Sequence, residues 1–154
     1  MNLGTSRVGA TDSILVSLAH FDTSKTERLE IISGNHLSGR PLHPLLLPMK
    51  ELRTLMLHQC RNLHIFIRAF HPGTSPSGIM VCPKLEELVL NVDIDEWDLD
   101  IQSVTEMVEA RASRGAKLRT VRMVDGSARP KVDPADVLEL SKHVWDAEYG
   151  PDAD

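Results

Sequence analysis

The clearest pattern of hydrophobic positions along the chain is a short leucine motif that recurs four times. It has the form Leu-x-x-Leu-x-Leu, and the weakest copy has threonine in the first position. The copies are Thr26, Leu29 and Ile31; Leu52, Leu55 and Leu57; Leu85, Leu88 and Leu90; and Leu118, Val121 and Met123. Side chains alternate between the two faces of an extended segment, so the last two residues of each copy share a face. Each copy therefore predicts a short strand with one buried face.

Apolar residues at helical spacing lie between these predicted strands. Gly115 is suited to the left-handed conformation that ends many helices, and Asp133-Pro134 is typical of a helix start. Three nearby prolines restrict the leucines at 45–47 to a turn or a single helical turn. Four helices are predicted, from about Ile14 to Phe21, Leu63 to Phe70, Ile101 to Arg114 and Pro134 to Leu140.

The alternation of strands and helices predicts one α/β domain spanning residues 1–154. We expect a last strand over residues 143–149, with Trp145, Ala147 and Tyr149 on one face. Such alternation forms a parallel sheet with helices on one side. One strand of this kind cannot bury its face alone, which predicts a short, irregular leucine-rich-repeat-like solenoid over residues 11–150. Residues 1–10 and 151–154 are expected to be frayed.

The composition favours a globular chain and excludes some partners. Hydrophobic residues make up 42% and charged residues 25%, whereas aromatic residues make up only 4%. A net charge of −5 gives no general attraction to nucleic acid or anionic lipid. No apolar run reaches the ~18 residues of a membrane helix, and no signal-peptide core precedes Ala10. We expect a cytoplasmic or nuclear protein that binds neither nucleic acid nor membrane.

The residues beside the buried leucines predict a binding surface. They must point away from the core, and stacking of the strands aligns them in columns on an exposed sheet face. Met56 and Val89 would form an apolar centre there, although strand propensity alone also explains Val89. The candidate partner-binding residues are Thr54, Met56, Glu87, Val89, Thr120 and Arg122, and Arg28 and Glu30 extend the same columns.

No catalytic or metal motif is evident. The chain has no nucleophile elbow, Walker loop or dinucleotide-binding fingerprint. Cys60 and His64 are the only pair with ligand-like spacing, whereas a structural zinc site needs four ligands. We therefore expect no cofactor, no metal and no enzymatic activity. An enzyme with a zinc-assisted site at Cys60 and His64, or a truncated product without selected activity, is the alternative.

A basic cluster follows the fourth predicted helix. Such a cluster binds phosphate, RNA or acidic peptides in some proteins. The structural alternative is a set of cations near the negative end of a helix. Its members are Arg111, Arg114, Lys117, Arg119 and Arg122.

Several segments resemble the leucine-rich repeats of F-box proteins from mushroom-forming fungi. These segments are MKELRTLMLHQC (Met49–Cys60), MVCPKLEELVL (Met80–Leu90), EARASRGAKLRTVRMV (Glu109–Val124) and PADVLELSKHVWDAEYG (Pro134–Gly150). In that family an F-box docks onto a ubiquitin-ligase adaptor and the repeats present a substrate. The resemblance implies a protein-interaction module for an unknown protein partner, without catalytic residues. The first ~20 residues contain no F-box-like start, so we expect no docking onto the adaptor.

Overall fold

Six strands form one parallel sheet in chain order in the computed structural model. The model describes residues 5–9, 22–32, 42–58, 60, 63–74, 78–91, 100–124 and 132–150. Every strand pairs in parallel with the next one, so the sheet order is β1-β2-β3-β4-β5-β6. The strands are β1 (Thr5–Gly9), β2 (Arg28–Ile32), β3 (Thr54–His58), β4 (Glu87–Asn91), β5 (Thr120–Val124) and β6 (Asp146–Gly150).

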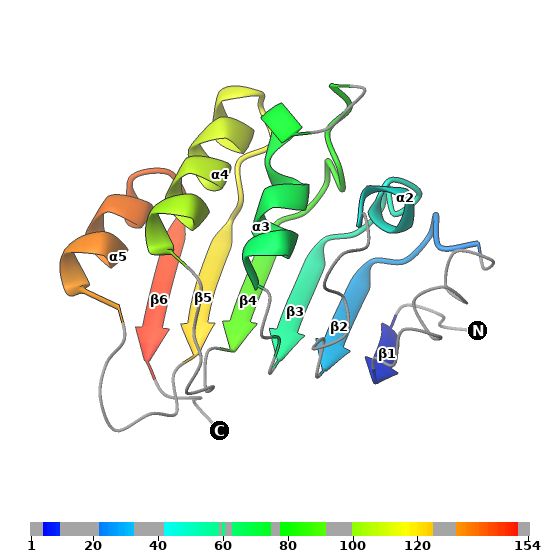
Figure 1. Ribbon diagram of the computed structural model, residues 1–154, viewed down its shortest axis with the longest axis horizontal. Coiled ribbons are helices and arrows are strands. Elements are labelled where there is room, and N and C mark those ends of the chain that lie inside the picture. The colour runs from blue at the N-terminus through cyan, green and yellow to red at the C-terminus, as the bar shows by residue number, and fades with distance from the viewer. Residues whose placement is uncertain are drawn as a thin grey trace.

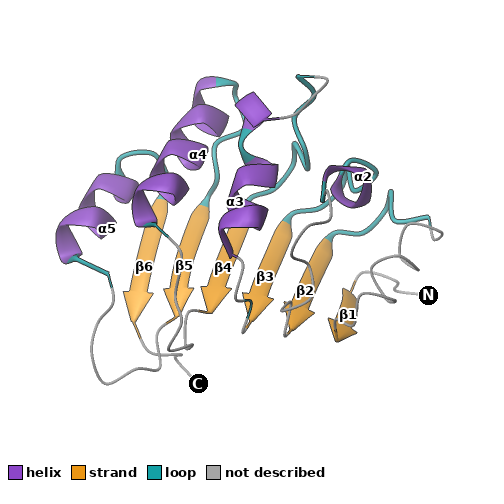
Figure 2. Cartoon of the chain, in the orientation of Figure 1, coloured by secondary structure: helices purple, strands orange, loops and turns teal. Residues whose placement is uncertain are grey.

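The helices lie together on one side of this sheet (Figure 1). Each helix follows a strand in the chain. Figure 2 shows the helices as a purple layer beside the orange strands of the sheet. They are α2 (His43–Leu46), α3 (Leu63–Phe70), α4 (Ile101–Ser113) and α5 (Pro134–Ser141), with a 3-10 turn, η1, at Pro72–Thr74. The molecule is therefore an α/β protein with a parallel sheet, as the sequence predicts. None of these helices is long and apolar enough to cross a membrane.

The recurring leucines form the core between the sheet and the helices. Leu55 and Leu57 of β3 are fully buried, and both align in register with leucines of β4. Leu52, Leu85 and Leu118, the first residues of three of the copies, are also buried just before their strands, whereas Thr26 is partly buried. Phe66 of α3 and Val104 of α4 join the same cluster. The predicted alternation of buried and outward residues is confirmed in β3, whereas Glu30 of β2 and Val89 of β4 are buried although they occupy outward positions.

The last strand contains a fifth copy of the motif that the sequence reading misses. Val144, Ala147 and Tyr149 have the same spacing, and the last two align in register with Val121 and Met123. Val144 is 4% exposed. The prediction that Trp145 shares a face with Ala147 and Tyr149 is wrong: those two pack against the core, whereas Trp145 precedes β6 and is 78% exposed. The first apolar position belongs to Val144, which shifts Trp145 out to the surface.

The first strand also differs from expectation. Residues 1–10 were expected to be frayed, yet Thr5–Gly9 pair in parallel with β2. The open edge of β2 offers backbone hydrogen bonds, which a segment of weak strand propensity accepts. The predicted helix over residues 14–21 and the tail at 151–154 lie outside the described residues.

The helix ends follow the sequence signals. The Asp100 carboxylate caps α4 by accepting a hydrogen bond from the Gln102 N–H at 3.0 Å, and Asp133 caps α5 in the same way. Gly115 has φ +80°, the left-handed conformation predicted after α4. The single helical turn predicted among the three prolines is α2.

Candidate functional site

The sheet face that points away from the helices presents two rows of aligned side chains. All-parallel sheets are usually covered by helices on both faces, whereas the helices in the described residues all lie on one face of this sheet. We call the face that points away from the helices the second face. Its rows are Arg28, Thr54, Glu87, Thr120 and Asp146, and then Glu30, Met56, Val89, Arg122 and Glu148.

The six candidate residues from the sequence occupy neighbouring positions in these rows. Thr54, Glu87 and Thr120 align in register across β3, β4 and β5, and the other three align one step further along the same strands. Four of the six are partly buried, Arg122 is exposed and Val89 is buried. Val89 and Arg122 mark the two extremes.

The expectation that Val89 is exposed is wrong. Its side chain is 4% exposed, although it does not belong to the main core cluster. The valine lies on a central strand, in register between Met56 and Arg122. The longer neighbours on both sides account for the burial of a short side chain on an outward position. Val89 therefore supports its neighbours and offers little contact area itself.

Polar contacts join neighbouring strands across the second face. The Thr54 hydroxyl donates to the Glu87 carboxylate at 3.1 Å, and Arg122 forms an ion pair with Glu148. The hydrogen bond to Glu148 raises the pKa of Arg122, and the nearby carboxylates of Glu87 and Asp146 act in the same direction. Arg122 therefore offsets part of the negative charge of the carboxylates around it.

A hollow of about 470 Å³ lies where the strands β3 to β6 begin. We call it the entry hollow, and it includes three of the six sequence candidates. The other lining residues were not predicted for this surface, although Arg119 belongs to the predicted basic cluster; they lie one position before the strands or at the start of β6. Its lining residues are Thr54, Glu86, Glu87, Arg119, Thr120, Trp145 and Asp146.

Trp145 gives the entry hollow an exposed aromatic surface. Its ring is 78% exposed, and the Lys117 ammonium lies 5.8 Å from the ring centroid, within the range of a cation–π contact. The backbone N–H groups of Trp145 and Asp146 both donate to the Arg119 carbonyl. The fifth copy of the leucine motif indicates the position of Trp145 from the sequence, because aligning the copies places Trp145 beside Arg119 and Glu86.

The basic cluster does not form a single patch. Arg111 is fully buried, and its guanidinium donates to the carbonyl oxygens of Val81 at 2.9 Å and Cys82 at 2.7 Å. Arg111 lies in the last turn of α4, as the structural alternative expects, and its guanidinium satisfies the carbonyls of a neighbouring loop. Arg114 donates to the Pro72 carbonyl at 3.4 Å. Of this cluster, only Arg119 lines the entry hollow, and the exposed Lys117 lies beside the Trp145 ring.

Burial shifts the pKa values of Arg111 and Cys82, which meet at this loop, in the directions expected for groups removed from water. It lowers the pKa of Arg111 to about 10, because a charged guanidinium is costly away from water. It raises the pKa of the Cys82 thiol to about 12, because the thiolate is costly in the same environment. Cys82 is therefore a protonated, buried thiol near neutral pH and lacks the properties of a nucleophile.

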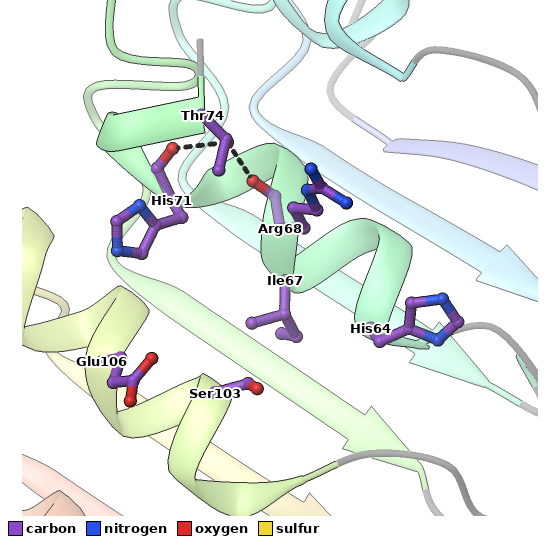
Figure 3. A pocket seen from close by; sticks show the side chains of 7 residues that line it. All are labelled: His64, Ile67, Arg68, His71, Thr74, Ser103 and Glu106. Atoms are coloured by element: carbon purple, nitrogen blue, oxygen red, sulfur yellow. Dashed lines mark hydrogen bonds between the residues drawn. The ribbon is translucent and has the colours of Figure 1, made fainter.

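A second hollow of about 380 Å³ lies between α3 and α4 (Figure 3). Ile67 contributes an apolar wall, and the His71 Nδ1 accepts the Gly73 backbone N–H at 3.0 Å. Ser103 makes no hydrogen bond to a histidine in the described part of the chain, so no serine–histidine pair is assembled there. The polar lining residues are His64, Arg68, His71, Thr74, Ser103 and Glu106.

The structure does not bring Cys60 and His64 together as metal ligands. Cys60 is 2% exposed, and its thiol lies 3.4 Å from the His58 carbonyl oxygen. His64 lies on the exposed side of α3, at the second hollow. Within the described ranges, no group of three or more histidine, cysteine, aspartate and glutamate residues could hold a metal ion.

Comparisons with models of known protein families, with curated protein sequences and with solved structures find no match to this chain.

Proposed function

We propose that this chain is a leucine-rich-repeat-like solenoid segment that binds a partner protein through its second face, at the entry hollow. The observation that carries the proposal is the exposed Trp145 beside a hollow on a one-sided sheet. Exposed tryptophan is unusual on a surface without a partner, and tryptophan is enriched among residues that dominate binding energy.

The resemblance to fungal F-box repeats supports the same assignment. In those proteins the repeats present a substrate for ubiquitin transfer, and the repeat region has no catalytic residues. The segment Pro134–Gly150, which is part of the resemblance, contributes Trp145 and Asp146 to the entry hollow. We propose that the chain acts in recognition and performs no chemistry of its own.

Site-specific crosslinking tests this proposal. A photoreactive amino acid at Thr120, inside the entry hollow, should give a discrete covalent adduct in an extract of the native cells. The same residue at Glu109, exposed on α4, is the control on the helical side. Excess unlabelled protein should compete with the Thr120 adduct, and Trp145→Ala should reduce it.

Adducts of equal yield from Thr120 and Glu109 would argue against a binding site on the second face. Adducts from Thr120 that neither competitor nor Trp145→Ala reduces would also contradict the proposal, because they would report nonspecific contact.

A further inference from the structure

The lining of the entry hollow has more negative than positive groups. It includes one cation, Arg119, and three carboxylates, those of Glu86, Glu87 and Asp146. Asp146 is exposed and follows Trp145 directly in the chain, so its carboxylate lies beside the most exposed aromatic ring of the described residues. A partner that approaches the tryptophan therefore meets carboxylates at the same place.

Two of these carboxylates have no cation of their own. Glu86 forms an ion pair with Arg53, whereas Glu87 and Asp146 form no ion pair in the part of the chain that the structure describes. Glu87 accepts a hydrogen bond from the Thr54 hydroxyl at 3.1 Å, and that neutral group leaves the charge of the carboxylate in place. The hollow therefore offers two negative charges to a ligand.

The positions of the two carboxylates suit one cationic group. Glu87 and Asp146 stand on either side of Thr120 at the same register position of β4, β5 and β6. Adjacent strands lie ~4.8 Å apart, so the two backbones are about 10 Å apart, with a short side chain between them. Arg122 lies further along β5 and is already paired with Glu148. The space above Thr120 is thus bordered by carboxylates from both neighbouring strands.

We propose that the entry hollow binds a basic segment of the partner protein, with the charged group of one lysine or arginine between Glu87 and Asp146. This inference rests on the proposed function and names the chemistry that the site recognises. An apolar residue beside the basic one packs on the exposed ring of Trp145. Lys117 lies near that ring and Arg119 lines the hollow, so a run of many positive charges would be repelled. The site therefore favours a single basic residue among apolar ones.

The same carboxylates disfavour other classes of ligand. Within the described ranges, no group of three or more histidine, cysteine, aspartate and glutamate residues could hold a metal ion, which argues against a metal in the hollow. A nucleic acid or an acidic peptide would bring negative charge to a lining in which carboxylates predominate, on a chain whose net charge is −5. A basic segment carries the charge that complements this lining.

Peptide selection on the full-length chain tests the inference. A random peptide library is displayed on phage and selected on the immobilised protein. Enriched peptides should share one lysine or arginine beside an apolar residue, and replacing that basic residue by glutamine should weaken the dissociation constant about tenfold. Asp146→Asn and Glu87→Gln should each weaken it about threefold, the size of an exposed ion pair. Neither substitution should affect binding of the glutamine peptide, because the interaction is then already lost.

Arg119→Ala reports the sign of the charge that the hollow recognises. It should tighten binding of the basic peptide about twofold, because it removes a like charge from the lining. Glu109→Gln is the matched control, since Glu109 is an exposed carboxylate on α4, on the helical side, and it should leave binding unchanged. The inference is overturned if no peptide binds, if acidic peptides are enriched, or if Arg119→Ala weakens binding while Asp146→Asn does not.

The crosslinking experiment separates this inference from the proposed function. If Thr120 still gives a competable adduct while Asp146→Asn and Glu87→Gln together have no effect on it, the second face binds a partner of different chemistry. If the adduct itself is absent, the proposed function fails as well.

Discussion

Arg111 is a buried cation whose partners are backbone carbonyls. Its guanidinium lies 2.9 Å from the Val81 oxygen and 2.7 Å from the Cys82 oxygen, and the Phe70 oxygen is 3.5 Å away. Buried carbonyls without donors are costly, and one side chain of α4 supplies the donors for the carbonyls of Val81 and Cys82. Cys82 has φ +45°, a conformation that is strained for a residue with a side chain. Arg111 holds this strained segment in place.

Arg111→Met should lower the free energy of unfolding by about 3 kcal/mol, because it leaves buried carbonyls without donors. Urea denaturation measures the change. Arg114→Met is the control: Arg114 is exposed, and its loss should cost about 0.5 kcal/mol. Equal effects of the two substitutions would show that the carbonyl contacts of Arg111 do not stabilise the loop.

The strands of this protein are short, and each depends on its neighbours. Five residues that alternate between two faces bury only two or three side chains, as β3 does with Leu55 and Leu57. The remaining stability comes from parallel pairing and from the helix packed above. Substitutions on the two faces of a strand should therefore lower the stability by different amounts. Val89 is an intermediate case, because it lies on the second face but is buried.

Substitutions on β3 and β4 should follow this gradation. Leu88→Ala should cost about 2–5 kcal/mol, because it opens a cavity in the main core. Met56→Gln, on the second face, should change stability by about 0.5 kcal/mol. Val89→Asn should fall between them, because it places a polar group at a site that is 4% exposed. Thermal or urea denaturation gives the order, and a Met56→Gln variant as unstable as Leu88→Ala would mean that the two faces are misassigned.

The described part of the chain is a linear stack in which each strand pairs with the next, and its last unit is the least buried. α5 has one buried residue, Leu140, whereas α3 has five. Leu138 and Trp145, both in this last unit, are 68% and 78% exposed. The stability of a stacked array is the sum of each unit and its neighbour contacts, so an end unit with one neighbour is held less tightly.

Native-state hydrogen exchange should show this difference along the stack. Backbone amides of β3 and β4 have paired strands on both sides and should exchange slowest. Amides of α5 and β6 should exchange about tenfold faster or more, because the last unit opens without disrupting the rest. Uniform protection across all six strands would show instead that the molecule opens only as a whole.

The spacing of apolar residues was sufficient to place β2 to β5, the helices α3 to α5 and the core. Those features depend on local periodicity and on capping residues such as Asp133, which act over a few positions of the chain. Alternation also assigned Thr54, Glu87 and Thr120 to one row, because register follows from burying the leucines.

Other features depended on contacts between residues far apart in the chain. Val89 is buried because two neighbouring strands place longer side chains beside it, and Arg111 is buried because a loop 30 residues away supplies its acceptor at Val81. The entry hollow joins Arg119 and Trp145 through the pairing of β5 and β6. Local periodicity carries no information about which distant side chains meet, so only the tertiary structure decided which residues join Thr54, Glu87 and Thr120 in the candidate site.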